Sequence, residues 1–259
     1  MFDQITPLIL TFNEAPNLAR TLAQLTWAAR IVVVDSGSTD DTLAICKKFP
    51  QVEVITRPFD DHTSQWNFGL DQVRTDWVLS LDADYVLTDE LVAELRVLAA
   101  ADGVAGFSAR FTYCIHGRPL RASLYPPRTV LFRRNHNRYV DDGHTQLLRS
   151  DGVVAELHGK ILHDDRKPLE RWFGEQLKYS AKEAVHLTST PAAQLNRADQ
   201  IRRKIILAPP LVLLLTLFGK GLILDGWAGW FYALQRTLAE VLLSLRLLEV
   251  KLKTIDHRP

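Results

Sequence analysis

The stretch Ile31-Val32-Val33-Val34, followed by Asp35-Ser36-Gly37-Ser38-Thr39-Asp40, decides the fold. Consecutive β-branched residues without polar alternation predict a strand that is covered on both faces. The residues after it combine a glycine with short polar side chains, which predicts a turn. Strands buried on both faces are typical of parallel sheets flanked by helices, so this stretch indicates an α/β fold.

Neighbouring segments extend the pattern in both directions. Further predicted strands are Ile5–Leu10, Val52–Thr56 and Trp77–Leu81. Helical patterns lie between them, from Pro16 through Leu25, from Asp41 to Phe49, and around Gln65 to Val73. This alternation of strand and helix predicts a doubly wound, mostly parallel sheet.

Polar side chains follow several of these strands at the point where each one ends. They are Thr11, Asn13 and Glu14 after the first strand, Asp35, Ser36 and Ser38 after the second, and Asp82 and Asp84 after the fourth. Ligands of open α/β sheets bind beyond the carboxyl ends of the strands. We therefore expect a binding site along this edge.

The tripeptide Asp82-Ala83-Asp84 can direct carboxylate oxygens into one crevice. Mg²⁺ and Mn²⁺ prefer oxygen ligands, and they complete their coordination with water and substrate phosphate oxygens. Asp35 has two interpretations, because an Asp at a strand end can cap a turn or accept a hydrogen bond from the base or ribose of a nucleotide. Neither a Gly-x-Gly-x-x-Gly loop nor a Gly-Lys-Ser/Thr loop follows the first strand, which disfavours dinucleotide-binding and P-loop folds.

In combination, these motifs resemble family 2 glycosyltransferases. The resemblance rests on Thr11-Phe12-Asn13-Glu14, Val33–Asp40, Asn67 within Gln65–Gly69, and Asp76–Asp84, in that order. It implies a GT-A-like fold, an inverting mechanism, a divalent metal and a nucleoside-diphosphate sugar donor, with uridine as the expected nucleoside. It also implies that Glu14 and Asp35 contact the nucleoside, Asp82 the ribose or the metal-bound diphosphate, and Asp84 the metal. Thr11, Asn13, Ser38 and Asn67 are assigned to the same donor site.

Within that family, the similarity is greatest to the branch of lipopolysaccharide-core glucosyltransferases, in which a His-Glu pair usually follows an aromatic and glycine-containing segment. The matching stretch here is Tyr139–Gln146, and Thr145 stands where the Glu is expected. The base that takes the proton of the acceptor hydroxyl is therefore predicted to be Asp142, with His144 and Asp141 as alternatives. Asp141 and Asp142 before Gly143 also fit an ordinary turn.

Two further groups bear on the acceptor. The segment Arg110–Arg138 is rich in arginine and aromatic residues, which can hold sugars and phosphates or form an ordinary charged surface. His163 matches a position near the active site of related enzymes.

Overall composition excludes some classes of protein. Lys and Arg number 31 against 30 Asp and Glu, so the chain lacks the basic character of a nucleic-acid-binding protein. The two cysteines, Cys46 and Cys114, are predicted to be small apolar residues in a reducing compartment. The N-terminus has no signal-peptide pattern, and we expect a cytoplasmic protein that associates with the inner face of the cell membrane.

The C-terminal region has a different composition. Ile205–Phe218 is apolar, is broken by Pro209-Pro210, and is shorter than the roughly 20 residues that a spanning helix needs. Basic residues flank it and Trp227, Trp230, Phe231 and Tyr232 follow, which favours surface attachment to a membrane; a buried helix pair or a homo-oligomer interface is the alternative. We expect a last helix from Phe231 to Leu252, a catalytic domain over 1–204 and a membrane-associating or oligomerisation region over 205–259.

The predicted function is transfer of a sugar to a glycolipid or polysaccharide acceptor, such as lipopolysaccharide, at the membrane. A sugar nucleotidyltransferase would also combine an α/β fold with metal-binding carboxylates, but it would be expected to carry a glycine-rich phosphate loop near the N-terminus. A non-catalytic membrane scaffold derived from a glycosyltransferase is the third hypothesis, because Thr145 replaces the expected Glu.

Overall fold

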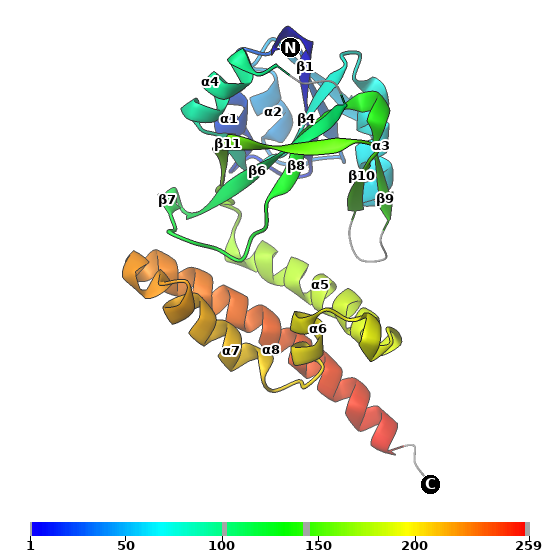
Figure 1. Cartoon of the computed structure of the whole chain (residues 1–259), viewed down its shortest axis with the longest axis vertical. Helices are drawn as coiled ribbons and strands as arrows, with labels where there is room; N and C mark the ends of the chain where they lie inside the picture. The colour runs from blue at the N-terminus through cyan, green and yellow to red at the C-terminus, as the bar shows by residue number, and fades with distance from the viewer. Residues whose placement is uncertain (1, 100–102, 142–145, 257–259) are drawn as a thin grey trace. The chain divides into compact units, whose positions relative to one another are not determined.

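The computed structural model describes residues 2–99, 103–141 and 146–256, with side chains up to residue 253. The chain divides into two compact units (Figure 1). The sheet unit comprises Met1–Pro119 and Tyr125–Arg166, and the helical unit comprises Leu120–Leu124 and Lys167–Pro259. This structural division falls earlier in the chain than the functional boundary expected after residue 204, which stays a prediction.

The sheet unit is built on one large sheet. Its strands run in the order β3 (Val52–Thr56), β2 (Ile31–Asp35), β1 (Ile5–Thr11), β4 (Trp77–Asp82), β8 (Arg128–Arg133), β6 (Val104–Ile115), β11 (Val153–His163) and β5 (Tyr85–Leu87), and β7 (Arg118–Pro119) pairs with β6. The first four strands in this order are parallel, as are β6 and β11, whereas β8 and β5 run antiparallel to their neighbours. The predicted mostly parallel sheet and its first four strands are confirmed.

Helices cover both faces of the parallel part. They are α1 (Leu18–Ala23), α2 (Thr42–Cys46), α3 (His62–Gln72) and α4 (Asp89–Val97), with a short 3₁₀ turn, η1, at Phe2–Gln4. Val33 packs into one core with α1 and α4, whereas Val32 and Val34 pack into the other core with Trp66 and Leu70 of α3. Successive residues of β2 thus enter opposite cores, which explains why this strand has no polar alternation.

Toward the β5 end of the strand order, β11 lies against α4 at a close approach. A Cβ on Gly159 would lie 2.5 Å from Leu91 Cα, so only glycine fits there. The register between β11 and β6 shifts between Glu156 and Lys160, and the Glu94 carboxylate accepts the amides of His158 and Gly159. At the register shift, these two backbone amides therefore donate their hydrogen bonds to a side chain instead of a neighbouring strand.

A separate hairpin of β9 (Asn137–Asp141) and β10 (Gln146–Ser150) follows the 3₁₀ turn η2 (Arg134–His136). Asn67 of α3 holds it, because its amide donates to the Tyr139 carbonyl at 2.9 Å and its side-chain oxygen accepts the Tyr139 amide at 3.0 Å. The Tyr139 ring also stacks on Trp66.

The helical unit contains two long helices, α5 (Leu169–Ser189) and α8 (Gly226–Asp256), and several short ones. The short elements are η3 (Ala192–Gln194), α6 (Arg197–Arg202), α7 (Ala208–Leu214), the π-helical turn η4 (Leu215–Gly219) and η5 (Leu222–Asp225). Inside the unit, Arg202 bridges Asp199 and Glu240. The predicted last helix is present and begins at Gly226 instead of Phe231.

Segment Leu120–Leu124 is tied to this unit by specific bonds. The Arg121 side chain and amide both donate to the Asp225 carboxylate, and the Leu124 amide donates to the Tyr232 hydroxyl. Over the residues that the structure describes, no individual helix has the length and apolar character to cross a membrane; by these two criteria alone, Ala208–Gly219 and Leu222–Lys253 together qualify as a pair bent by 69°.

Candidate active site

Asp35 organises the loop after β2. Its Oδ1 accepts hydrogen bonds from Thr11 Oγ1 at 2.8 Å and Ser38 Oγ at 2.6 Å, and its Oδ2 accepts the amides of Gly37 and Ser38. The carboxylate is fully buried, and Gly37 adopts a left-handed conformation that lets the chain turn back onto it. Asp35 therefore fixes the shape of the loop, in agreement with the turn interpretation. A direct contact with a nucleoside stays a prediction.

The loop after β1 is bonded to the loop after β2. The Asn13 amide donates to Ser38 Oγ at 2.8 Å, and Asn13 Oδ1 accepts the Thr39 amide at 2.7 Å. The Glu14 amide donates to Thr42 Oγ1 at 2.7 Å. Thr11, Asn13, Glu14, Asp35 and Ser38 are thus brought together as the sequence predicts. Asn67 is the exception among the donor-site residues, because the bonds of its side chain go to β9.

A glutamine that the sequence analysis missed also reaches this loop. Gln65 of α3 is buried, and its side-chain amide donates to Ser36 Oγ at 3.0 Å. The signals for it were its place in the stretch Gln65–Gly69 that resembles the family and its position one helical turn from the start of the helix after Val52–Thr56.

The carboxylates of Asp82 and Asp84 lie at the end of β4. Asp82 pairs in register with Leu10 of β1, which places it beside the nucleoside loops. Burial and the neighbouring Asp84 carboxylate together raise the pKa of Asp82. A buried carboxylate at Asp84 and a partly buried one at Asp82 that repel each other suit a hard divalent cation, which would compensate their charge.

The described residues contain no cluster of three or more His, Cys, Asp or Glu arranged to hold a metal ion. This is compatible with Mg²⁺ or Mn²⁺, because these ions commonly bind through one or two carboxylates and take their other ligands from water and phosphate. Asp82 and Asp84 therefore fit the predicted role, which the structure does not test directly.

His163, the last residue of β11, contacts the Asp84 carboxylate. Its Nε2 lies 3.2 Å from Asp84 Oδ2, and the rings of Tyr85, Tyr113 and Tyr125 surround it at centroid distances of 5.2, 4.7 and 4.6 Å. Burial acts to lower the pKa of His163, but the charge and hydrogen bond of Asp84, together with the charges of Asp82 and Asp165, outweigh burial, and the pKa is raised. The Asp164 amide donates to the Asp84 carbonyl, which ties the two segments together through their backbones.

A buried polar network next to His163 was not predicted. Asn17 is fully buried and uses its whole side-chain bonding capacity. Its amide donates to Glu14 Oε2 and to Asp165 Oδ1, and its oxygen accepts from Arg20 Nη2 and from the Arg166 amide. Arg20 forms an ion pair with Asp164. The network joins the donor-side loop to the segment that follows β11.

The position of the catalytic base is only partly described. Asp141 is the last residue of β9 and is exposed. Asp142, His144 and Thr145 lie outside the described residues, so the assignment of the base stays a prediction.

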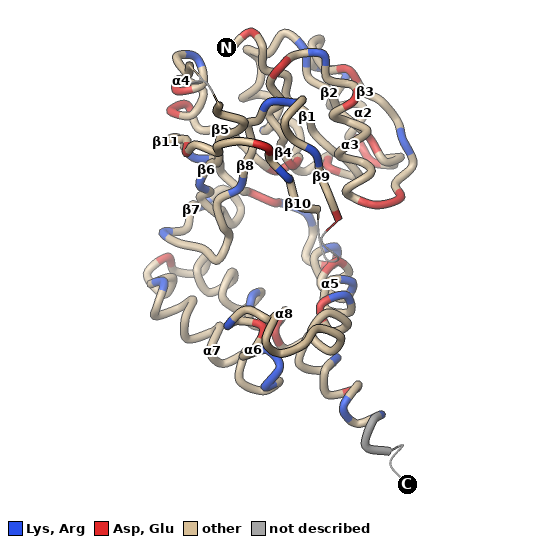
Figure 2. The backbone as a smooth tube through the Cα atoms, turned by 45° about the vertical axis from the view of Figure 1, so that its right-hand side comes forward, with Lys and Arg blue, Asp and Glu red and all other residues tan. Residues whose placement is uncertain are grey.

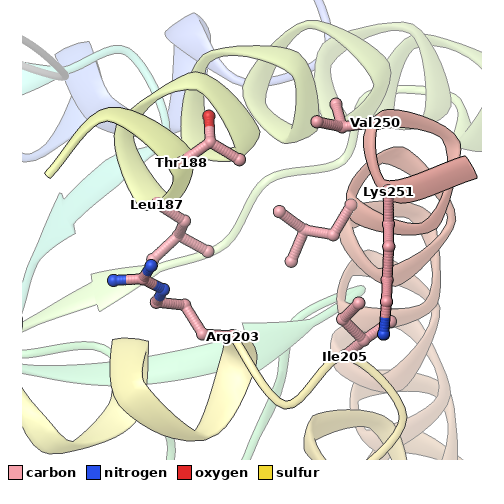
Figure 3. Close-up of a pocket in the computed structure, with 7 residues that line it drawn as sticks. Leu187, Thr188, Arg203, Ile205, Val250 and Lys251 are labelled. Atoms are coloured by element: carbon pink, nitrogen blue, oxygen red, sulfur yellow. The ribbon is translucent and has the colours of Figure 1, made fainter. Parts of the chain in front are cut away.

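A pocket of about 200 Å³ lies in the helical unit (Figure 3). Leu187 of α5, Arg203 after α6 and Lys251 of α8 are among its lining residues. It includes none of the predicted site residues, so we assign it no part in catalysis.

Comparisons with known proteins agree with this geometry. Residues 8–153 match the model of glycosyl transferase family 2, which is more than half of the chain. The lipopolysaccharide core biosynthesis glycosyltransferase LpsC of Rhizobium meliloti is 28% identical over 241 residues, covering 89% of this chain and 86% of that protein. An uncharacterized glycosyltransferase of Rickettsia felis is 35% identical over 100 residues, which are 38% of this chain and 35% of that one.

Among solved structures, the mannosyltransferase PcManGT from Pyrobaculum calidifontis, in complex with GDP-Man and Mn²⁺, has a TM-score of 0.54 at 14% identity. The match covers 98% of this chain and 88% of that one, and it confirms the predicted GT-A-like fold. The family match includes the loops of Asn13 and Asp35 and the carboxylates of Asp82 and Asp84. The chain therefore belongs to glycosyl transferase family 2.

Proposed function

We propose that the protein is an inverting glycosyltransferase that transfers a sugar from a nucleoside-diphosphate donor, with uridine as the preferred nucleoside, to a glycolipid or polysaccharide acceptor at a membrane surface. The observation that carries this proposal is the meeting of three strand ends. The bonded loops after β1 and β2 lie beside the carboxylates at the end of β4. LpsC, which is similar over most of its length, supports an acceptor of the lipopolysaccharide class.

Asp82 and Asp84 would hold Mg²⁺ or Mn²⁺ in this site. When bound, such an ion neutralises charge that develops on a diphosphate leaving group. The loops of Asn13 and Asp35 orient the nucleoside, and Asp142, or alternatively His144 or Asp141, takes the proton of the acceptor hydroxyl as its oxygen attacks the anomeric carbon. The bond between that carbon and the diphosphate breaks on the opposite face, so the configuration inverts.

The helical unit supports attachment to the cytoplasmic face of a membrane. Residues 205–219 contain no charged side chain, and Figure 2 shows the tube of α7 without acidic or basic residues. Leu211, Leu214 and Phe218 recur at helical spacing and are 47%, 54% and 62% exposed. Trp227, at 84% exposure, lies shortly beyond Lys220. An exposed apolar stripe with an aromatic and a basic residue next to it suits insertion into a lipid interface.

The decisive experiment measures nucleotide binding and donor hydrolysis together. Calorimetric titration with UDP in the presence of Mn²⁺, and release of UDP from UDP-sugars in the absence of acceptor, should both be positive for the parent. In Asp84→Ala, metal-supported turnover should be abolished with the fold intact, because the change removes a carboxylate from the end of a strand and creates no large cavity.

Asp89→Ala is the matched control, since Asp89 is an exposed carboxylate on α4 in the same unit. Unchanged metal-dependent turnover in a folded Asp84→Ala variant would remove Asp84 from the site. A parent protein that neither binds nor hydrolyses any nucleoside-diphosphate sugar would favour the scaffold hypothesis.

A further inference from the structure

Arg128 lies beside the carboxylate pair, on the strand next to β4. The antiparallel register pairs Trp77 with Arg133 and Leu79 with Leu131. Arg128 is the first residue of β8, and because β8 runs antiparallel to β4, it lies toward the end of the sheet at which β4 ends with Asp82. The charge of Asp82 acts on the Arg128 guanidinium, in agreement with this placement.

The guanidinium of Arg128 stacks on a ring, and among the residues that the structure describes it has no carboxylate partner. It lies over Tyr125, 5.1 Å from the ring centroid, and the residue is exposed. Over the described ranges, it makes no hydrogen bond and no ion pair. By contrast, Arg30, Arg57 and Arg138 of the same unit each pair with a carboxylate. Arg128 therefore presents its donors to solvent in a fixed orientation, which is the geometry that binds phosphate or carboxylate oxygens.

The ring under Arg128 is itself fixed. Tyr125 shares a hydrogen bond with Tyr85 and packs edge-on against Phe111 and His163. Burial acts to lower the pKa of Arg128, but Tyr125, Tyr85 and Asp82 outweigh it and raise the pKa, so the side chain stays a cation.

The order of strands indicates which substrate Arg128 faces. The loops assigned to the nucleoside follow β1 and β2, on one side of β4, whereas β8 is the neighbour of β4 on the other side. Across this edge of the sheet, the loops assigned to the nucleoside come first, the carboxylates of Asp82 and Asp84 follow, and Arg128 comes last. An acceptor on the β8 side of the carboxylates would meet Arg128, so an anionic group on that acceptor would gain a charge-assisted contact there that a neutral acceptor lacks.

We propose that Arg128, supported by Tyr125, forms a subsite for a phosphate or carboxylate group carried by the acceptor. This inference rests on the proposed function and adds a charge preference to it. It assigns the acceptor to the class of anionic glycans. It also means that the Arg128 guanidinium, which recognises the acceptor, is distinct from the groups that hold the donor.

The test uses small probes because the acceptor is unidentified. Binding of glucose 6-phosphate, glucuronate and glucose to the full chain, in the presence of UDP and Mn²⁺, is measured by ligand-observed NMR titration. The parent should bind the two anions more tightly than glucose. Arg128→Gln should weaken anion binding about tenfold or more, as expected for loss of charge-assisted hydrogen bonds, and leave glucose unchanged. Arg128→Lys should keep part of the preference, because it keeps the charge but loses the planar fork.

Controls separate this inference from its alternatives. Arg110→Gln alters an exposed arginine of the adjacent strand β6, which pairs with Glu156, and should behave as the parent. Affinity for UDP with Mn²⁺ should stay within about twofold of the parent in every variant, a change of no more than about 0.4 kcal/mol.

Three results would overturn the proposal. If the parent binds glucose 6-phosphate and glucuronate no more tightly than glucose, the proposed subsite is excluded. Weakened UDP binding in Arg128→Gln with the anion preference retained assigns Arg128 to the donor diphosphate instead. A parent that binds no nucleoside diphosphate at all rejects the proposed function first, and this inference with it.

Discussion

The Asn17 network makes a strong prediction about stability. Asn17→Ala removes four side-chain hydrogen bonds, three of which involve charged partners: Glu14, Asp165 and Arg20. The fourth comes from the Arg166 amide. Hydrogen bonds to charged groups contribute about 1.5–3 kcal/mol each, and the values are not additive because water can replace some of them.

The expected loss of unfolding free energy for the sheet unit is about 3 kcal/mol, since Asn17 is fully buried but Arg20 is partly exposed and can be rehydrated. This corresponds to more than about a hundredfold in the ratio of folded to unfolded protein. Asn17→Asp keeps the size and one acceptor, but it places a third carboxylate between Glu14 and Asp165. Its loss of stability should therefore be at least as large near pH 7 and should diminish as the pH falls and these carboxyl groups become protonated.

Urea unfolding measures the global effect, and hydrogen exchange at the Arg166 amide measures the local one. Asn135→Ala is the control, because Asn135 is an exposed asparagine of the same unit, in η2. A loss below about 1 kcal/mol with unchanged protection at Arg166 would show that the network does not hold the two segments together.

Two further predictions concern burial and exposure. Burial raises the pKa of Cys46 and of Cys114 from 9.0 to about 11, so both thiols should resist iodoacetamide at pH 8 in the folded protein and react after unfolding; rapid labelling of either thiol in the folded state would contradict its burial. The free energy of unfolding should fall as the pH rises from about 9 to about 11, because the thiols of the unfolded chain ionise first. For the helical unit, the double variant Phe218→Ser with Trp227→Ser should float less with anionic liposomes than the parent, whereas Val97→Ser, at an equally exposed apolar residue of the sheet unit, should float like the parent. Equal flotation of the parent and both variants would reject membrane insertion. A dimer that light scattering detects in the parent and in Val97→Ser, but not in the double variant, would instead assign the exposed apolar residues of the helical unit to contact with a second copy of the chain.

The central strands of the parallel half could be predicted from the sequence because β2 and β4 are buried on both faces. Ile31–Val34 is uninterrupted and apolar, Trp77–Leu81 is apolar except for Ser80, and an aspartate follows each of them. The antiparallel additions could not be predicted in the same way. β11 alternates exposed and buried residues over Glu156–Ile161 and contains a register shift, so its pattern does not indicate which strand it joins.

The candidate site shows the same division. Local spacing predicted that Asp82 and Asp84 share a strand end and that Asp35 begins a polar loop. It could not predict that Asn17 would meet Asp165, because these residues are 148 positions apart and neither lies in a recognisable motif. Nor could it show that the bonds of Asp35 are taken by Thr11, Gly37 and Ser38, since a turn and a nucleotide contact require the same residue type.

The bonds of Leu120–Leu124 to Asp225 and Tyr232 have a consequence for how this chain can be shortened or recombined. Because the polypeptide leaves the sheet unit after Pro119, returns at Tyr125 and leaves again after Arg166, the helical unit is assembled from two separate pieces of sequence. A truncation after residue 166 would leave residues 120–124 without their hydrogen-bond partners. A graft of residues 167–259 onto another enzyme would lack residues 120–124, which bind Asp225 and Tyr232. Exchange of the helical unit between homologues therefore requires that residues 120–124 be transplanted together with it.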